Sequence, residues 1–152
     1  MPRIIEAADP DWILRHDVYG MGTPLPSFHR GRVALLGDAV HAMQPSLAQG
    51  GNQAIEEAVV LAHHVGAGEP GRFAAGLAGY SADRLPRTGA VVRRAARASR
   101  MASVSSPAGA AVRDRMIAAL SRFGPGLVLR GMDGIADWCP PGRTYASRTS
   151  RP

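Results

Sequence analysis

The chain has 152 residues, 45% of them hydrophobic, and a single cysteine, which describes about one globular domain without an internal disulfide. No basic start precedes an apolar run, and no stretch approaches the roughly 20 apolar residues that span a bilayer, so we expect a cytoplasmic protein without a signal peptide or membrane span. The net charge is +6, with four arginines and eight acids before residue 70 and fourteen arginines and four acids after it.

The apolar content predicts a thin hydrophobic core. Of the 69 hydrophobic residues 26 are alanine, and only eight residues of the chain are aromatic. Alanine buries little apolar area, and the burial of apolar area is the main favourable contribution to folding. We therefore expect the chain to be part of something larger that covers some of its surface.

Two segments in the first third of the chain have strand patterns. Residues 12–19 alternate in part between apolar and polar side chains, which predicts a strand. Residues 20–27 hold two glycines and two prolines, which predict a loop. Residues 32–37 have the sequence Arg-Val-Ala-Leu-Leu-Gly, and a short apolar run that ends in glycine is typical of a strand buried on both faces of a parallel sheet.

A helix is predicted over residues 52–65. Apolar side chains recur there at intervals of three and four residues, which is the rhythm of one helix face. Glu56 and Glu57 fall in the early turns, where the helix dipole favours acids. Gly66 predicts the end of this helix.

Two further helices are predicted in the second half of the chain. The first covers residues 72–101, with a kink or break expected near Pro86. The second covers residues 108–122 and is introduced by Ser105-Ser106-Pro107, a capping sequence with proline at the first helical position. Residues 139–152 have the composition of a frayed tail.

The segment between the second strand and the first helix is the most informative for function. Asp38 directly follows the strand, and ligands of open α/β sheets bind beyond the carboxyl ends of the strands. An ionised aspartate accepts several hydrogen bonds and donates none, which suits a polyhydroxylated ligand such as a sugar or ribityl chain. An Asx turn or a helix cap explains the same residue about equally well, and the sequence leaves both interpretations open.

Gly50 and Gly51 lie at the start of the predicted helix. Without side chains, they allow a flat ligand to come within contact distance of the backbone. The free amides at the beginning of a helix, together with its positive dipole end, favour developing negative charge. We therefore expect this turn to face a ligand that carries negative charge.

This segment resembles the second flavin-binding motif of the aromatic-hydroxylase family of FAD-dependent monooxygenases, which are para-hydroxybenzoate hydroxylase-like. The family pattern is an arginine-led strand, then Gly-Asp-Ala-x-His, a proline, and a glycine-rich turn that ends in asparagine. The sequence has these features in order as Arg32, then Gly37-Asp38-Ala39-Val40-His41, then Pro45, then Gln49-Gly50-Gly51-Asn52. The resemblance covers roughly residues 12–103. The departures are Ala48, where many relatives have glycine, and Glu57, where many have aspartate.

The resemblance implies an α/β fold class, with this chain as a predominantly helical C-terminal fragment of an FAD/NAD(P)-binding Rossmann-like fold. It implies an oxidoreductase, a flavoprotein hydroxylase that uses FAD, NAD(P)H and dioxygen to oxygenate a small aromatic or polyketide-like, polycyclic substrate. The implied cofactor-binding residues are Gly37, Asp38, Pro45, Gln49, Gly50, Gly51 and Asn52. Asp38 would hydrogen-bond the ribityl chain, Pro45 would border the flavin ring as the candidate catalytic residue, and the amides of Gly50, Gly51 and Asn52 would face the pyrimidine edge.

The strand and GxGxxG turn with which family members begin have no counterpart here. Residues 66–71 satisfy the GxGxxG pattern, but they follow a predicted helix and hold Glu69 and Pro70 at the phosphate position, so we expect no phosphate site there. We therefore expect a fragment that binds FAD weakly or not at all by itself and that needs an N-terminal partner half. The expected parts are the end of a substrate-domain sheet with its return loop (1–27), a flavin-binding strand, turn and helix (28–68), a helical region (69–124) and a poorly structured tail (125–152).

Three alternatives remain. His41 could serve as a general base, although a structural role is favoured. The adjacent His63 and His64 point about 100° apart on a helix, so they cannot bind one metal ion from the same face, and no metal site is expected. The chain could be a truncated, non-catalytic remnant or half of a split flavoprotein. A basic helical module for nucleic acid is disfavoured, because the arginine stripe that begins at Arg93 lacks interleaved aromatic residues.

Overall fold

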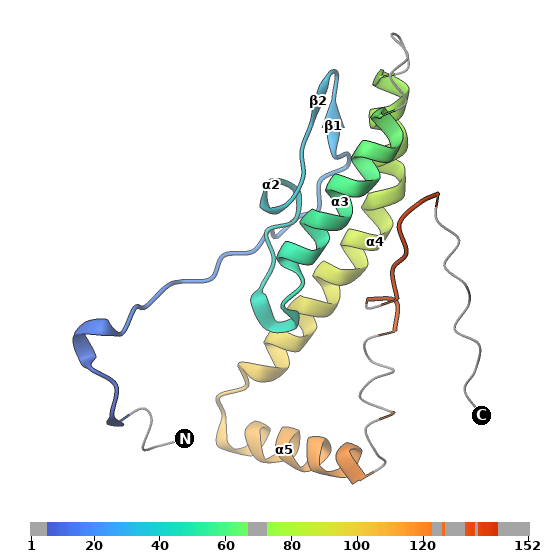
Figure 1. Ribbon diagram of the computed structural model, residues 1–152. Coiled ribbons are helices and arrows are strands. Elements are labelled where there is room, and N and C mark those ends of the chain that lie inside the picture. Colours follow the sequence, from blue (N-terminus) through green and yellow to red (C-terminus); the bar gives the residue numbers. More distant parts are fainter. Residues whose placement is uncertain (1–5, 67–72, 123–125, 127–132, 136, 143–152) are drawn as a thin grey trace.

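The computed structural model describes residues 6–66, 73–122, 126, 133–135 and 137–142, and two long helices dominate it (Figure 1). In chain order the elements are the 3₁₀-helix η1 (Pro10–Trp12), strands β1 (His29–Arg30) and β2 (Val33–Ala34), helix α2 (Asp38–His41), the 3₁₀-helix η2 (Pro45–Leu47), and helices α3 (Gly50–Val65), α4 (Phe73–Ala102) and α5 (Pro107–Arg122). The described chain is mostly helical with a small sheet, which agrees with the predicted α/β fragment.

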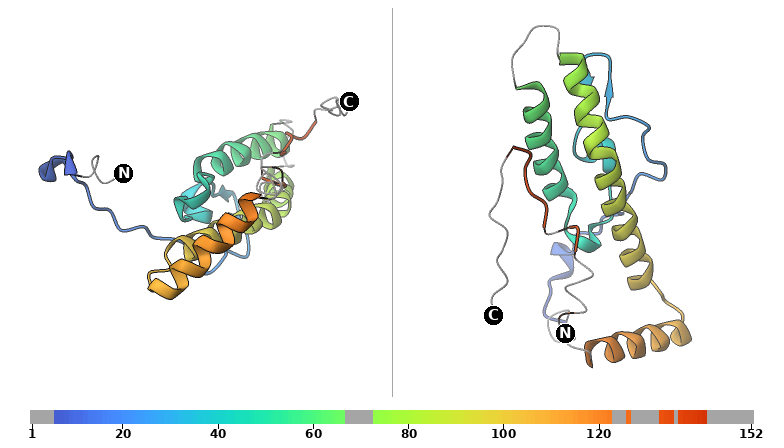
Figure 2. Two further views of the ribbon diagram at one scale, coloured as in Figure 1. Left: turned by 90° about the horizontal axis from the view of Figure 1, so that it is seen from below. Right: turned by 90° about the vertical axis from the view of Figure 1, so that its right-hand side faces the viewer.

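Helices α3 and α4 lie side by side and run in opposite directions at the centre of the molecule (Figures 1 and 2). The apolar spacing that predicted a helix over residues 52–65 forms α3, which starts slightly earlier, at Gly50, and is followed by Gly66 as its C-cap. The hydrophobic core joins this pair to the chain that precedes it. Its buried members are Phe28, Val40, Val60 and Tyr80.

The strand predicted over residues 32–37 is shorter and more exposed than expected. Only Val33–Ala34 forms a strand, and it pairs antiparallel with His29–Arg30 as a two-residue hairpin. The side chains of Val33, Leu35 and Leu36 are 61%, 39% and 40% exposed, so the prediction of burial on both faces was wrong for this chain. A parallel strand needs a parallel neighbour, and the sheet of the described residues contains only one antiparallel pair.

The strand predicted over residues 12–19 is also absent. Pro10–Trp12 forms a 3₁₀-helix capped by the Asp9 carboxylate, which accepts from the Asp11 amide, and residues 13–19 run as an exposed chain without regular structure. This segment extends away from the helix pair in Figure 1. Its alternating pattern is compatible with a strand, but the described chain offers no sheet edge beside it.

Pro86 does not interrupt the second predicted helix. Helix α4 is continuous from Phe73 to Ala102, with Pro86 on its exposed side. Proline removes one backbone hydrogen bond and crowds the preceding turn, and this costs about 3 kcal/mol in an isolated helix. Here the buried side chains of Arg84 and Thr88, on either side of the proline, hold both halves of α4 against α3.

The third predicted helix is confirmed as α5. It begins at Pro107, and the Ser106 hydroxyl accepts a hydrogen bond from the Gly109 amide at 3.2 Å, as its capping sequence predicted. No helix among the described residues has both the length and the apolar character needed to cross a membrane. Most of the predicted tail, residues 143–152, lies outside the described residues.

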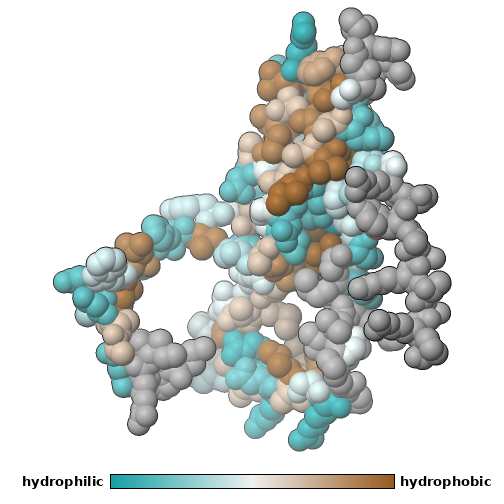
Figure 3. All heavy atoms as spheres, viewed as in Figure 1, coloured by the Kyte–Doolittle hydropathy of each residue, from teal (hydrophilic) through white to brown (hydrophobic). Residues whose placement is uncertain are grey.

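An apolar surface extends over β2 and the outer side of α3. The exposed large hydrophobic side chains there are Val33, Leu35, Leu36, Ile55 and Val59. Apolar residues gather over this upper part of the molecule in Figure 3. Several exposed apolar side chains on one part of a molecule are typical of a face that another part of a protein covers.

Candidate functional site

The turn that follows β2 is held by a single buried carboxylate. Glu57 on α3 is 0% exposed, and its Oε2 accepts the backbone N–H of Gly37 at 2.8 Å and lies 3.0 Å from Nε2 of His41. Its other oxygen, Oε1, accepts from the hydroxyl of Thr88 on α4 at 3.0 Å. The two ends of the short helix α2 are therefore attached to one side chain of α3.

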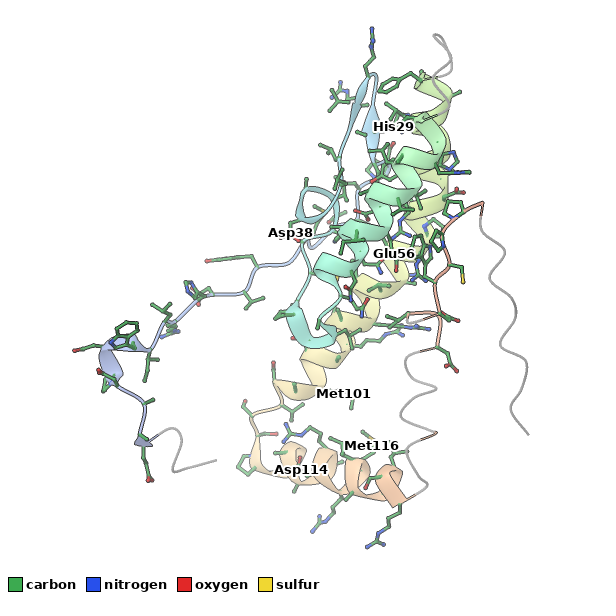
Figure 4. The ribbon with its side chains drawn as sticks, viewed as in Figure 1. His29, Asp38, Glu56, Met101, Asp114 and Met116 are labelled. Carbon is green, nitrogen blue, oxygen red and sulfur yellow. The ribbon has the colours of Figure 1, made fainter. Side chains whose placement is uncertain are left out.

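Gly37 has a backbone conformation that other residues avoid. Its φ is 62° and its ψ is −142°, a region that is open essentially to glycine alone. The glycine of the Gly-Asp pair is thus required by the backbone that brings the chain out of β2 and into α2. The side chain of the next residue, Asp38, is exposed, and it is labelled in Figure 4.

The two structural alternatives for Asp38 find no support in the described contacts. Asp38 is the first residue of α2, its N-cap is Gly37, and no side-chain capping bond is made. No hydrogen bond or ion pair among the described residues uses the Asp38 carboxylate. Its oxygens therefore remain available to a ligand.

The loop that leads into α3 presents backbone amides to solvent. Pro45–Leu47 forms one 3₁₀ turn, Ala48 follows in the left-handed conformation with φ 51° and ψ 36°, and α3 starts at Gly50. The first backbone bond at this end of α3 runs from the Gln53 amide to the Gln49 carbonyl at 2.8 Å. The amides before it, those of Gly50, Gly51 and Asn52, are the free donors of the helix start.

The surroundings of this helix start are open. Gly51 and Asn52 are exposed, and a Cβ added to Gly51 would meet no atom within 4 Å. Helix α2, which starts with the exposed Asp38, lies beside the middle of α3, where Glu57 contacts both of its ends. The chain that leads into α3 lies below α2 in Figure 1, on the same side of the helix pair.

A second buried network joins α3 to α4 beside this site. Glu56 accepts from Nη1 of Arg84 at 2.9 Å and from Nε and Nη2 of Arg87 at 2.6 and 2.7 Å. Arg84 also donates to Oε1 of Gln53 at 2.8 Å. The hydrogen bonds from Arg87 to Glu56 raise the pKa of the Arg87 guanidinium, so this arginine stays charged.

The arginines of α4 also hold part of the C-terminal segment. Arg87 donates to the carbonyls of Gly134 and Ile135, and Arg94 donates to the carbonyl of Asp133 at 2.7 Å. The guanidinium carbon of Arg84 lies 6.0 Å from the ring centre of Trp138, a cation–π distance. These three arginines therefore serve structure within the fold.

The sequence did not predict the burial of Glu56 and Glu57. The sequence assigned them to early turns, where the dipole favours acids, but α3 begins at Gly50 and has no acid in its first turn. The structure places both against cations and donors that are 16 to 31 residues away in the chain. The apolar spacing pointed to the opposite face. Ile55, Ala58 and Val59, which belong to the predicted apolar stripe, are exposed, whereas Glu56 and Glu57 lie with Gln53 and Val60 on the buried face of α3.

The favoured structural role of His41 agrees with its burial at 1% exposure and its contact with Glu57. Nε2 of His64 contacts the Asp83 carboxylate at 2.7 Å, and the rings of His63 and His64 lie edge to face. No group of three or more potential metal ligands occurs among the described residues. Gly66 follows α3 as predicted, whereas residues 67–71 of the GxGxxG pattern lie outside the described residues.

The chain matches a family model and two kinds of known protein. Residues 11–95 match the model described as FAD binding domain. Zeaxanthin epoxidase from Nicotiana plumbaginifolia is 41% identical over 108 residues, which are 66% of this chain and 16% of that protein. Aurachin C monooxygenase/isomerase from Stigmatella aurantiaca is 40% identical over 87 residues, which are 57% of this chain and 22% of that protein.

A solved structure matches as well. The crystal structure of Klebsiella pneumoniae HpxO complexed with FAD and uric acid superposes with a TM-score of 0.73 at 30% sequence identity. The superposition covers 86% of this chain and 32% of HpxO. The chain thus spans about a sixth to a fifth of the curated relatives given above and about a third of HpxO.

Proposed function

Because the chain belongs to the FAD binding domain family of aromatic-hydroxylase-type monooxygenases, we propose that it supplies the flavin-ring and ribityl side of an FAD site. The whole protein would be an FAD-dependent monooxygenase that uses NAD(P)H and dioxygen to oxygenate a small aromatic or polycyclic molecule. The uric acid bound by HpxO, a small heteroaromatic compound, supports this substrate class.

One observation carries this proposal. The chain that leads into the free amides of α3 lies on the same side of the helix pair as α2, which starts with the exposed Asp38, and the space in front of Gly51 is open (Figure 1). A row of amides at a positive helix end favours an electron-rich, anionic ring edge. A carboxylate nearby favours hydroxyl donors. An isoalloxazine ring that carries a ribityl chain offers both features in one ligand.

Each residue of the site then has a distinct role. Asp38 would accept hydrogen bonds from ribityl hydroxyls, since its oxygens are exposed and uncommitted. The amides of Gly50, Gly51 and Asn52 would donate to the pyrimidine edge, and Gly37 and Gln49 would set the backbone around these contacts. Pro45, which has no amide hydrogen, would border the ring without competing for its hydrogen bonds.

When bound, FAD would accept a hydride equivalent and supply the redox chemistry with dioxygen. The chain's own residues bind and orient it. The helix end of α3 stabilises negative charge on the ring edge, and this effect is strongest where water is excluded. We place no proton-transfer step on His41, because its Nε2 is committed to the buried carboxylate of Glu57.

The apolar face over β2 and α3 supports a second part of the proposal. We propose that the remainder of the FAD domain, as an N-terminal portion or partner half, covers Val33, Leu35, Leu36, Ile55 and Val59. In α/β folds a parallel sheet with helices on both faces buries such residues. The domain division at residues 1–27, 28–68, 69–124 and 125–152 follows the same proposal, with the flavin contacts in the second part.

A chimera tests this function. The chain would replace the matching third of Klebsiella pneumoniae HpxO, and the purified chimera would be desalted and its flavin measured by visible absorbance. We expect bound FAD near one per protein, with weaker binding in Asp38→Ala and unchanged binding in Asp114→Ala, a change at an exposed aspartate of α5. A folded chimera without flavin, or equal binding in both variants, would contradict the proposal.

A further inference from the structure

Two adjacent glutamates of α3 are both buried, and they bind different parts of the molecule. Glu56 contacts Arg84 and Arg87, and therefore joins α3 to α4. Glu57 contacts Gly37, His41 and Thr88, and therefore joins α3 to the turn that carries Asp38. Glu56 thus serves the helix pair alone, whereas Glu57 contacts both α4 and the turn, and it is the glutamate that bonds the turn.

We infer that Glu57 is a positioning residue, which fixes the backbone from Gly37 to His41 and thereby aims Asp38 at the cofactor. The inference rests on the proposed FAD site for its functional meaning. Glu57 itself is 0% exposed and cannot touch a ligand, so it acts through the residues it holds.

The turn has few other means of holding its shape. Helix α2 has four residues, and so short a helix gains little from its own hydrogen bonds. The residue at its entry, Gly37, is a glycine, which can adopt many backbone conformations. A contact from outside the turn is therefore needed to fix the one conformation that is observed. The 2.8 Å bond from the Gly37 amide to Glu57 is that contact.

The exit of the turn is held by the same atom. Oε2 of Glu57 also lies 3.0 Å from Nε2 of His41, the last residue of α2. A carboxylate only accepts, so Nε2 carries the hydrogen of this bond. One oxygen atom therefore fixes both ends of α2, and the turn between them has little freedom to reorient Asp38.

Glu57 is anchored to the rest of the fold through its second oxygen. Thr88 of α4 donates to Oε1 at 3.0 Å, so three donors surround the carboxylate. A buried carboxylate that lost these donors would pay a large desolvation cost. The hydrogen bonds that hold the Glu57 carboxylate in place therefore also hold the turn in place.

Amide hydrogen exchange on the isotopically labelled 152-residue chain tests this role without FAD. In Glu57→Leu, which removes the acceptors but keeps an apolar volume, we expect the Gly37 amide to exchange about tenfold faster relative to Val91 in α4. The proton on Nε2 of His41 should also lose its hydrogen-bonded shift. In Glu57→Gln, which keeps one acceptor oxygen, most of the Gly37 protection should return.

Glu56→Gln is the matched control, since it weakens the neighbouring pairs with Arg84 and Arg87 and leaves the contacts of Gly37 intact. We expect no change there in the ratio of Gly37 to Val91 exchange. Uniformly faster exchange in Glu57→Leu, with that ratio unchanged, would show a merely structural role and overturn the inference. The measurement uses no cofactor, so its outcome is separate from that of the chimera.

Discussion

Nη1 of Arg84 on α4 lies 2.9 Å from Oε2 of Glu56 on α3, and the two side chains are 1% and 9% exposed. Two ionised groups taken out of water are costly to separate, because the group left behind is buried without its full set of partners. The Arg84–Glu56 pair therefore makes a large contribution to the stability of the contact between α3 and α4.

We predict that Arg84→Leu lowers the free energy of unfolding by about 3 kcal/mol, near the lower end of the cost of breaking a buried pair, because Arg87 continues to neutralise Glu56. Urea denaturation followed by helical circular dichroism measures this loss. Arg93→Leu, at an exposed position of the same helix, should change stability by no more than about 0.5 kcal/mol. Similar losses in both variants would show that the buried pair has no special role.

The substitution Ala48→Gly should stabilise the fold. Its left-handed conformation, with φ 51°, costs a residue with a Cβ roughly 1–2 kcal/mol. Ala48→Gly should therefore raise the unfolding free energy by about 0.5–1 kcal/mol, after the entropic cost of glycine in the unfolded chain is subtracted. Ala58→Gly, at an exposed position inside α3, should instead lower it by about 1 kcal/mol. A loss in both variants would contradict the prediction.

The ionisation of Tyr80 at alkaline pH should lower the free energy of unfolding. Burial raises the pKa of its hydroxyl, which donates to the Leu35 carbonyl at 2.8 Å. Because the folded pKa lies above the unfolded value of about 10, this contribution is complete below that pH and is lost as the pH rises through the folded pKa. Unfolding free energies measured at increasing alkaline pH should fall in the wild type and in Tyr19→Phe, whose tyrosine is exposed. In Tyr80→Phe this fall should be smaller, and an equal slope in all three proteins would contradict the assignment.

The isolated chain should bind FAD weakly. Its proposed contacts reach the ring and the ribityl chain, and the described residues contain no strand, glycine-rich turn and helix that could hold a pyrophosphate. Titration of FAD fluorescence with the purified 152-residue chain should give no saturation at micromolar protein. Flavin that copurifies at one per chain would show that the chain needs no further part for binding.

The elements that the sequence predicted well are those whose causes are local. The Ser106 cap, the position of Pro107 and the spacing of apolar residues before Gly66 all act within a few residues, and α3 and α5 appear where they place them. Residues 12–19 and 32–37 have strand composition, but a strand requires a neighbour. In the part of the chain that the structure describes, residues 12–19 have none, and residues 32–37 have only the two-residue strand β1.

The site was predictable only in part, for the same reason. Asp38 and the glycines of α3 belong to a contiguous motif, and the structure places α2 and the chain that leads into α3 on one side of the helix pair. The buried function of Glu57 depends on Gly37, His41 and Thr88, which no short window of sequence contains together with it. These contacts of Glu57 can be identified only from the packed structure.

The most direct test of the proposed FAD site is the flavin affinity of Gly51→Ala in the HpxO chimera, measured together with its stability. A Cβ at Gly51 meets no atom of the chain within 4 Å, and alanine favours a helix by up to about 1 kcal/mol, so the fold should be as stable or more so. If the flavin edge lies against the Gly51 amide, FAD affinity should fall by about tenfold or more, while Gly22→Ala, equally open and outside the motif, should leave it unchanged. Full FAD affinity in a stable Gly51→Ala chimera would contradict the proposed site.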